Sequence, residues 1–409
     1  MKVTKTNNLF GDVYISGSKN AALPCICAAL LTKEKVRLKN VPDIDDINNL
    51  LLIIKSIGVK VTKADDSILI DAKKVRSKVV NELVSKLRGS YYLMGSLIAR
   101  RKKMEIIYPG GCNIGLRPID LHLQGFKTIG CLVKDAKEKI EIIKENEKNG
   151  KITFPVSSMG ATINLILAAT IGKSITEIIN PSLEPEVYCV IDMLNKMGAN
   201  IKITQDKIIV EGVKKLKGVT HFIMYDRIEA GSYLFLAGAV PHSKVTIHNV
   251  DYKQLEIVIV VARKLGIKVV KENNSLIVEG PQEIKKTNIL IGPYPFFPTD
   301  LQQILTVVLT KSFSSIIEDS IFPNRIAHLK ELRKMQGYVY DYNHIIYIRK
   351  SNLKSSKVKA TDLRCAFALI IAGAMANGTT YIKDIDYLFR GYENPIYKLR
   401  SIGVNVEII

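Results

Sequence analysis

The sequence predicts an α/β protein of two domains, built from six repeats of about 70 residues. Three observations support this fold class. A short amphipathic helix that ends at a glycine and is followed by an alternating strand recurs six times along the chain. A second helix, apolar around its whole circumference, recurs between the copies of the first. Finally, 409 residues exceed what one ordinary hydrophobic core holds, so two domains of three repeats each are expected.

The amphipathic helices are recognised by the residue at which each one ends. Glycine takes the left-handed backbone conformation that closes a helix without a steric penalty. The six helix ends are Gly58, Gly130, Gly198, Gly266, the pair Gln336–Gly337, and Gly403. In four repeats a second strand clearly follows the first, so each repeat is predicted as β-α-β-α-β-β.

The apolar helices are predicted at equivalent positions in all six repeats. A helix without a polar face is usually buried. We therefore expect an inside-out arrangement, in which the sheets lie outside the helices. The predicted ranges are 20–31, 89–99, 160–170, 231–239, 300–310 and 365–376.

A net charge of +20, from 59 Lys and Arg against 39 Asp and Glu, favours anionic partners. The basic residues are spread along the chain, and the sequence has neither an aromatic-rich basic motif nor zinc-finger spacing. We therefore expect phosphorylated small molecules rather than nucleic acid. The first residues lack the apolar core of a signal peptide, and no stretch of about 20 uncharged apolar residues occurs. These features predict a cytoplasmic protein with no membrane partner.

The six cysteines differ in their surroundings. Most sit in apolar runs, as small core residues do, and the nearest pair, Cys25 and Cys27, has no matching His or Cys cluster along the chain, so no metal site is predicted. Cys112 instead lies in the glycine-rich stretch 108–126, five residues before Arg117. Glycines let such a segment bend, and a nearby guanidinium favours the reactive thiolate. A buried structural cysteine in a tight turn is the alternative interpretation.

Charged and polar residues recur where the predicted apolar helices begin and in the loops around them. Backbone amides at a helix start bind anions, and a Lys or Arg beside them adds positive charge. Any one of these residues alone could be a helix cap or half of a surface ion pair. Their recurrence predicts a cleft between two domains that suits two anionic substrates. They are Lys19, Asn20, Arg88, Ser158, Arg227, Asp300, Arg325, Arg364 and Arg390.

Together these stretches resemble the UDP-N-acetylglucosamine 1-carboxyvinyltransferase family of enolpyruvyl transferases. The resemblance covers essentially the whole chain, and the cysteine loop is its most specific part. The motifs are Ser-Gly-Ser-Lys19-Asn20, Pro-Gly-Gly-Cys112 to His122, Asp226-Arg227-Ile-Glu229, Phe-Pro-Thr-Asp300, Asn324-Arg325, Thr-Asp362-Leu-Arg364 and Arg390-Gly-Tyr392. The resemblance implies a two-domain inside-out α/β barrel. Residues 20–225 would form the domain that carries Cys112, residues 1–19 and 226–409 the second domain, and the active site would lie between them.

The resemblance also implies a reaction. The enolpyruvyl group of phosphoenolpyruvate would pass to the 3-hydroxyl of UDP-N-acetylglucosamine with release of phosphate, the first committed step of peptidoglycan synthesis. This chemistry needs a proton for the methylene carbon, a base at the hydroxyl, and cations for the phosphate and carboxylate. Lys and Arg can neutralise these charges, so neither a metal nor a cofactor is expected.

Residue roles follow from the place of each residue in the motifs. Cys112 would act as the general acid and Asp300 as the base near the sugar hydroxyl. Lys19, Arg117 and Arg390 would hold phosphoenolpyruvate. The catalytic residues implied by the resemblance are Cys112, Asp300, Lys19 and Arg390. The other implied substrate contacts are Asn20, Arg88, Pro118, Asp120, Leu121, His122, Ser158, Phe322, Arg325 and Arg364.

Two other functions stay open at this point, and the chain departs from the family pattern in places. Phe389 stands where many relatives have Asp, and Val156 stands where some have Lys. The first alternative is the sister transferase that uses shikimate phosphate, against which the Cys112 loop argues. The second is a non-catalytic binder of anions or nucleic acid, whose affinity would fall steeply with salt.

Overall fold

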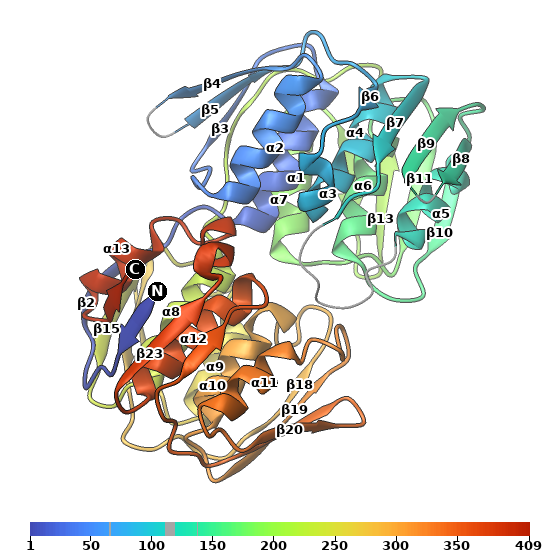
Figure 1. Cartoon of the computed structure of the whole chain (residues 1–409). Coiled ribbons are helices and arrows are strands. Elements are labelled where there is room, and N and C mark those ends of the chain that lie inside the picture. The colour runs from blue at the N-terminus through green and yellow to red at the C-terminus, as the bar shows by residue number, and fades with distance from the viewer. Residues whose placement is uncertain (65–66, 111–118, 137) are drawn as a thin grey trace. The chain divides into compact units, whose positions relative to one another are not determined.

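The computed structural model describes residues 1–64, 67–110, 119–136 and 138–409. The predicted site residues Cys112, Arg117 and Pro118 therefore lie outside the described residues. Contacts divide the described chain into two compact units (Figure 1). Unit 1 comprises residues 1–16 and 225–409, and unit 2 comprises residues 17–110 and 119–224. Within the described ranges, the chain leaves unit 1 after Ser16 and returns to it after Met224.

In the described residues each unit contains three four-stranded sheets of one pattern. Each sheet has one parallel pair of strands at an edge, and its other neighbours pair antiparallel. The sheets of unit 2, in spatial order, are β14 (Thr220–Phe222), β3 (Val36–Lys39), β5 (Ser67–Asp71), β4 (Lys60–Ala64); β6 (Lys78–Val79), β7 (Lys103–Ile107), β9 (Lys139–Lys144), β8 (Cys131–Ala136); and β10 (Gly150–Thr153), β11 (Ile175–Ile179), β13 (Lys207–Glu211), β12 (Asn200–Ile203). Those of unit 1 are β16 (Lys268–Glu272), β17 (Ser275–Glu279), β15 (Lys244–His248), β2 (Phe10–Tyr14); β18 (Asn288–Ile291), β19 (Ser314–Asp319), β21 (Ile345–Arg349), β20 (Val339–Tyr342); and β22 (Lys357–Lys359), β23 (Thr379–Lys383), β1 (Lys2–Thr4), β24 (Asn405–Glu407).

Two sheets take their parallel edge strand from a distant part of the chain. Strand β2 comes just before helix α1 (Lys19–Ala28) of unit 2, yet it pairs with β15 in unit 1. Strand β14 comes just before helix α8 (Arg227–Ala239) of unit 1, yet it pairs with β3 in unit 2. In the sixth repeat, β1 lies between β23 and β24, the place that the last strand of the repeat takes in the other sheets. The predicted β-α-β-α-β-β repeats are thus confirmed, with edge strands exchanged where the chain crosses.

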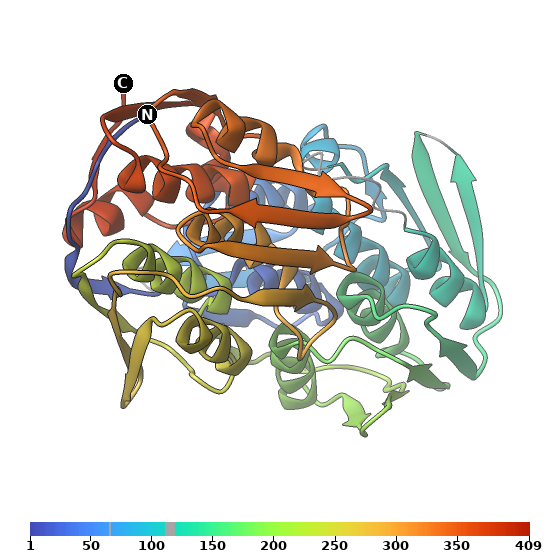
Figure 2. The same ribbon diagram turned by 90° about the horizontal axis from the view of Figure 1, so that it is seen from below.

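The apolar helices form the centre of each unit, which confirms the predicted inside-out arrangement (Figure 1). In α8 all 13 residues are buried. In Figure 2 the orange sheet β18–β19–β21–β20 lies in front of the helices of unit 1, and its strands β19 and β21 contact the central helix α10. The central helices are α1, α4 (Tyr92–Arg100) and α6 (Met159–Ala169) in unit 2, and α8, α10 (Gln302–Leu309) and α12 (Leu363–Met375) in unit 1.

The amphipathic helices end as predicted. The residues at the six predicted ends have φ between 62° and 98°, the left-handed conformation that closes a helix. In the fifth repeat the residue in this conformation is Gln336. The amphipathic helices are α2 (Asp45–Ser56), α5 (Asp120–Thr128), α7 (Pro185–Lys196), α9 (Glu256–Lys264), α11 (Ala327–Lys334) and α13 (Pro395–Ser401). The short helices are η1 (Ala29–Leu31), α3 (Leu83–Lys86), η2 (Arg88–Tyr91), η3 (Thr299–Leu301) and η4 (Ile385–Arg390).

Each unit has a hydrophobic core of its own. The described cysteines are free thiols, and all of them except the half-buried Cys189 are buried. Within the described ranges, the helices are too short or too polar for any of them to cross a membrane.

Candidate active site

The clearest candidate site in unit 1 is a cluster of three charged side chains. Asp300 lies in η3, just before α10, and its carboxylate accepts a hydrogen bond from each of two arginines. Arg325 Nη1 donates to Oδ1 at 2.9 Å, and Arg364 Nη2 donates to Oδ2 at 2.9 Å. The side chains of Arg325 and Arg364 are only 4% and 2% exposed, whereas that of Asp300 is 28% exposed. The carboxylate is thus the most exposed part of this cluster.

Asp362 holds both arginines in position. Its Oδ1 caps α12 by accepting backbone N–H groups of the first turn, including that of Arg364 at 2.9 Å. Its Oδ2 accepts the side-chain amide of Gln303 at 2.9 Å. Asp362 Oδ1 also lies 3.8 Å from Arg325 Nη2. Burial raises the pKa of Asp362, but the charge of Arg325 and the hydrogen bonds outweigh it and lower the pKa overall. Burial likewise opposes the charge on Arg364, yet the Asp300 carboxylate raises the pKa of Arg364 above its ordinary value.

Arg364 retains capacity for further hydrogen bonds. Its guanidinium carbon lies 5.4 Å from the centre of the Tyr392 ring, whose hydroxyl is hydrogen-bonded to Ser232 at 2.8 Å. The Nε and Nη1 atoms of Arg364 and the Nε of Arg325 are buried and have no hydrogen-bond partner among the described residues. Unsatisfied buried donors are unfavourable, so these N–H groups favour an anionic ligand or ordered water beside them.

Asp319, which the sequence analysis did not single out, joins the loops that carry Asp300 and Arg325. It is the last residue of β19 and is buried. Its Oδ2 accepts the hydroxyl of Thr299 at 2.6 Å, and its Oδ1 accepts two backbone N–H groups of the following loop, including that of Phe322 at 2.9 Å. The carbonyl of Phe322 in turn accepts the backbone N–H of Arg325 at 2.9 Å. The predicted contact residue Phe322 therefore helps to set this loop through its backbone.

The residue at which the chain leaves unit 1 is held by a second buried ion pair. Glu229 of α8 accepts the backbone N–H of Ser16 at 2.9 Å and the ammonium group of Lys398 at 2.7 Å. Lys398 also donates to the Ser16 hydroxyl at 2.6 Å. Burial raises the pKa of Glu229 despite the opposing charge of Lys398. Arg390, a predicted substrate cation of the same unit, is half-buried and ends η4.

In unit 2, Lys19 is fixed at the start of a central helix. It is the first residue of α1, which Ser18 caps by accepting a backbone N–H group. The ammonium group of Lys19 lies 3.2 Å from the carboxylate of Asp46 in α2, and the two side chains are 13% and 7% exposed. The next residue, Asn20, is half-buried. The charge of Lys19 therefore adds to the positive end of the helix dipole.

Arg88 and His122 form a second group in unit 2. Arg88 donates to the carbonyl of Pro109 at 3.2 Å, and its guanidinium carbon lies 5.6 Å from the centre of the Tyr91 ring. The His122 ring packs edge-on against the same tyrosine, with 4.7 Å between ring centres. Nδ1 of His122 accepts the amide of Asn164 at 2.9 Å, and burial, followed by the charge of Arg88, lowers the pKa of His122 to about 3. His122 is therefore neutral, and its ring positions α5.

The remaining predicted contacts of unit 2 lie at helix starts. Asp120 and Leu121 open α5, with Asp120 exposed and Leu121 half-buried. Ser158 caps α6, where its hydroxyl accepts a backbone N–H at 3.3 Å. The structure thus brings Asp300, Arg325 and Arg364 together in unit 1 and Arg88 and His122 together in unit 2.

Sequence reasoning missed three polar residues that fix these groups. They are Asp46 beside Lys19, Asp319 beside Thr299, and Asn164 beside His122. Asp46 looks like an ordinary acid at a helix start, and Asp319 like the polar end of a strand. Asn164 is the one that carried a usable signal, because it is an amide in the middle of an otherwise apolar helix, where a buried polar group needs partners.

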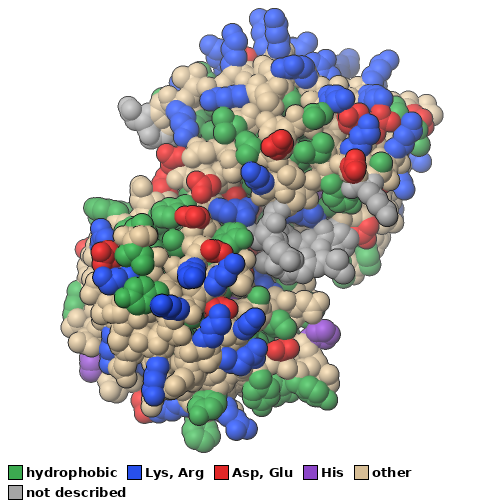
Figure 3. Space-filling view, viewed as in Figure 1, with side chains coloured by type: hydrophobic (Ala, Val, Ile, Leu, Met, Phe, Trp, Pro, Cys, Tyr) green, Lys and Arg blue, Asp and Glu red, His purple; other side chains and the backbone are tan. Residues whose placement is uncertain are grey.

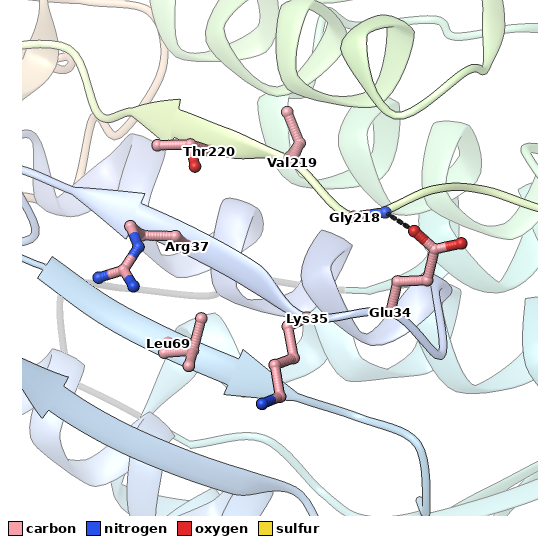
Figure 4. Close-up of a pocket in the computed structure, with 7 residues that line it drawn as sticks. All are labelled: Glu34, Lys35, Arg37, Leu69, Gly218, Val219 and Thr220. Atoms are coloured by element: carbon pink, nitrogen blue, oxygen red, sulfur yellow. Dashed lines mark hydrogen bonds between the residues drawn. The ribbon is translucent and has the colours of Figure 1, made fainter.

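A pocket in unit 2 lies apart from these groups, beside strands β3, β5 and β14 (Figure 4). The backbone N–H of Gly218 donates to the Glu34 carboxylate at 2.8 Å at its edge. No predicted site residue lines it, and we assign it no function. Its lining residues are Glu34, Lys35, Arg37, Leu69, Gly218, Val219 and Thr220.

The positive charge of the chain is spread over both units on the face shown in Figure 3. Lys and Arg side chains are interspersed there with Asp and Glu rather than gathered in one continuous patch. This distribution matches the spread of basic residues along the sequence.

Comparison with known protein families gives a match over nearly the whole chain. The family model for EPSP synthase (3-phosphoshikimate 1-carboxyvinyltransferase) matches residues 3–399. A UDP-N-acetylglucosamine 1-carboxyvinyltransferase of Finegoldia magna is 38% identical, with 100% of this chain and 98% of the relative covered. A protein of the same name from Clostridium botulinum is 40% identical, with 99% of each chain covered.

Solved structures share the fold at lower sequence identity. The enolpyruvyl transferase NikO from Streptomyces tendae superposes with a TM-score of 0.91 at 18% identity, over 99% of this chain and 98% of that one. An EPSP synthase from Acinetobacter baumannii gives a TM-score of 0.76 at 15% identity, over 99% of each chain. At these identities the likeness shows the fold alone.

Proposed function

Because the chain belongs to the EPSP synthase family of enolpyruvyl transferases, we propose that it transfers the enolpyruvyl group of phosphoenolpyruvate to the 3-hydroxyl of UDP-N-acetylglucosamine. The observation that carries the choice of acceptor is the identity of 38–40%, over essentially the full length, to relatives named UDP-N-acetylglucosamine 1-carboxyvinyltransferase. The products are the enolpyruvyl ether and phosphate. The reaction is the first committed step of peptidoglycan synthesis.

The reaction consists of an addition and an elimination. In the addition, an acid protonates the methylene carbon of phosphoenolpyruvate, and the sugar oxygen bonds to the neighbouring carbon while its proton passes to a base. In the elimination, the new methyl group loses a proton and the phosphate leaves with the bonding electron pair. No group is oxidised or reduced overall. The protein therefore has to supply an acid, a base and charge neutralisation.

Asp300 suits the role of base at the sugar hydroxyl. Each of its oxygens accepts one arginine N–H, and a carboxylate oxygen can accept more than one hydrogen bond, so the group can also take a hydroxyl proton. Its position is fixed by Arg325 and Arg364, and Asp362 in turn lies near the Arg325 guanidinium and accepts the backbone N–H of Arg364. A base held this firmly is already oriented before the substrate binds.

The cations divide between the two units, and we assign both groups to one reaction. Lys19 and Arg88 in unit 2, with Arg390 in unit 1, would neutralise the phosphate and carboxylate of phosphoenolpyruvate, and Arg117 would join them. Arg364 would meet the acceptor or the leaving phosphate through its unsatisfied N–H groups.

Cys112 is proposed as the acid that protonates the methylene carbon. The assignment rests on the motif that surrounds it, in which three glycines and Arg117 accompany the thiol. Three cysteines of the described chain, Cys27, Cys131 and Cys365, suit this role less well. Burial raises the pKa of Cys27, Cys131 and Cys365, which keeps these thiols unreactive in the core.

The test compares acceptors. Phosphate release from phosphoenolpyruvate is measured with UDP-N-acetylglucosamine, with shikimate 3-phosphate and with no acceptor, for the wild type and for Cys112→Ala. The proposal predicts release only with UDP-N-acetylglucosamine and only in the wild type. Phosphate release with shikimate 3-phosphate instead would show that the chain has the activity of the sister transferase. Phosphate release without any acceptor would refute carboxyvinyl transfer.

The site of action follows from the substrates. Phosphoenolpyruvate and nucleotide sugars are made inside the cell, so we propose that the protein acts in the cytoplasm, without a membrane or nucleic-acid partner. Because peptidoglycan has to grow before a cell can divide, its activity would support cell shape and division.

A further inference from the structure

Three side chains from distant parts of unit 2 bring metal-binding atoms together. They are Cys25 of α1, Cys189 of α7 and His221 of β14, and their ligand atoms all lie within 4.8 Å of one another. Cys189 Sγ lies 3.4 Å from His221 Nε2. Cys25 is 0% exposed, His221 is 3% exposed and Cys189 is half-buried. None of the three belongs to the candidate active site.

The spacing of these atoms suits a tetrahedral ion. With a zinc–sulfur bond of about 2.3 Å and a zinc–nitrogen bond of about 2.0–2.1 Å, neighbouring ligand atoms lie roughly 3.5 Å apart. The sulfur of Cys189 and the nitrogen of His221 already have nearly this separation. An ion between them would draw in the sulfur of Cys25 from a distance that is at most about 1 Å too long.

The surroundings of His221 also match a metal ligand. Its second ring nitrogen, Nδ1, is buried, has no hydrogen-bond partner among the described residues, and lies 3.6 Å from a carboxylate oxygen of Asp192. Metal-binding histidines usually donate this second N–H to a carboxylate, which fixes the tautomer. A proton on Nδ1, held toward Asp192, leaves Nε2 with a free lone pair that faces the sulfur atoms. Asp192 lies one turn after Cys189 in α7, so the same helix supplies a ligand and its support.

Zinc-class ions bind cysteine as the thiolate, so a divalent ion would displace the thiol protons of Cys25 and Cys189 and neutralise both sulfur atoms.

We propose that Cys25, Cys189 and His221 bind one divalent ion of the zinc class, with water as the fourth ligand on the half-buried side of Cys189. Two thiolates and one imidazole are a ligand set that zinc accepts. The ion would tie α1, which begins at Lys19, to α7 and β14, and so stabilise unit 2. The sequence analysis predicted no metal site because residues 25, 189 and 221 are far apart in the chain and meet only in the fold.

The test uses Co²⁺, whose absorption reports both thiolate ligation and tetrahedral geometry. Full-length protein carrying Cys112→Ser, so that the loop thiol cannot contribute, is reduced, freed of metal with a chelator and titrated without thiol reagents. The proposal predicts thiolate-to-cobalt absorption that saturates at one equivalent and disappears when Zn²⁺ is added. Cys189→Ser and His221→Gln should lose this absorption. Cys27→Ser is the matched control, because Cys27 is buried in the same helix but lies outside the cluster, and it should keep the absorption.

Several outcomes would overturn the proposal. The first is the absence of cobalt absorption at one equivalent. The others are an unchanged spectrum in Cys189→Ser and a loss of absorption in Cys27→Ser equal to that in Cys189→Ser. A disulfide between Cys25 and Cys189 in protein purified without reductant, combined with no cobalt binding after reduction, would indicate a redox pair instead. Circular dichroism shows whether each variant is folded. If Cys189→Ser is unfolded, the cobalt spectrum of His221→Gln decides whether the cluster binds the ion. As a second readout, Zn²⁺ should raise the unfolding temperature of the Cys112→Ser protein but not that of the same protein with Cys189→Ser.

Discussion

Replacing Asp300 with alanine should destabilise unit 1 as well as stop catalysis. The substitution leaves the guanidinium groups of Arg325 and Arg364, 4% and 2% exposed, without the carboxylate that neutralises them. Removing one partner of a buried ion pair costs about 3–5 kcal/mol. Asp300 itself is 28% exposed, and Asp362 still lies 3.8 Å from Arg325, so we take the lower end of this range. A loss of about 3 kcal/mol is roughly a hundredfold in the folding equilibrium.

Urea unfolding followed by circular dichroism measures this loss, since the chain contains no tryptophan to report by fluorescence. If the penalty comes from uncompensated charge, Asp300→Ala should cost less in an Arg364→Leu background than in the wild type. The control is Asp341→Ala, an exposed aspartate of β20, which should change stability by about 0.5 kcal/mol or less. Wild-type stability in Asp300→Ala, or strict additivity in the double variant, would refute the ion-pair reasoning.

Two further predictions concern the acid and a buried histidine. Cys112→Ala should abolish turnover in a phosphate-release assay, whereas Cys112→Asp should keep activity because a carboxylic acid can deliver a proton; an inactive Cys112→Asp enzyme would count against the acid role. Burial lowers the pKa of His328 to about 3, so the unfolded chain, in which that pKa is about 6.5, binds more protons at acid pH. The buried neutral ring of His328 makes its full contribution to the free energy of unfolding above pH 6.5. That free energy should fall by about 2 kcal/mol on going down to pH 5. Urea unfolding at pH 7 and pH 5 should show this loss, and His328→Leu should be less sensitive to pH by that amount; equal sensitivity would contradict the reasoning.

The fold could be predicted from the sequence because its signals are local and repeated. Each amphipathic helix ends at a residue that suits the left-handed conformation, and the observed φ values at Gly58 and the five equivalent positions confirm the six helix ends. Apolar residues on every side of a helix indicate burial whatever the topology. These two signals placed the helices in the centre and the sheets around them.

The exchange of edge strands could not be predicted in the same way. Nothing in residues 10–14 or 220–222 shows which of two similar sheets each strand joins, because parallel pairing is decided by tertiary packing. The partners of the site residues were hidden for a similar reason. Lys19 meets Asp46, and Asp319 meets Thr299, across 27 and 20 residues of chain respectively. A cap or a strand end in the sequence does not reveal such a partner.

The measurement that tests the central claim most directly is the stoichiometry of product formation. The protein is incubated with phosphoenolpyruvate and UDP-N-acetylglucosamine, phosphate is quantified, and the nucleotide product is identified by mass spectrometry. We expect one phosphate for each UDP-N-acetylglucosamine that gains an enolpyruvyl group. Phosphate without the enolpyruvyl ether, or no reaction with both substrates present, would contradict the assignment of this chain as a carboxyvinyltransferase that acts on UDP-N-acetylglucosamine.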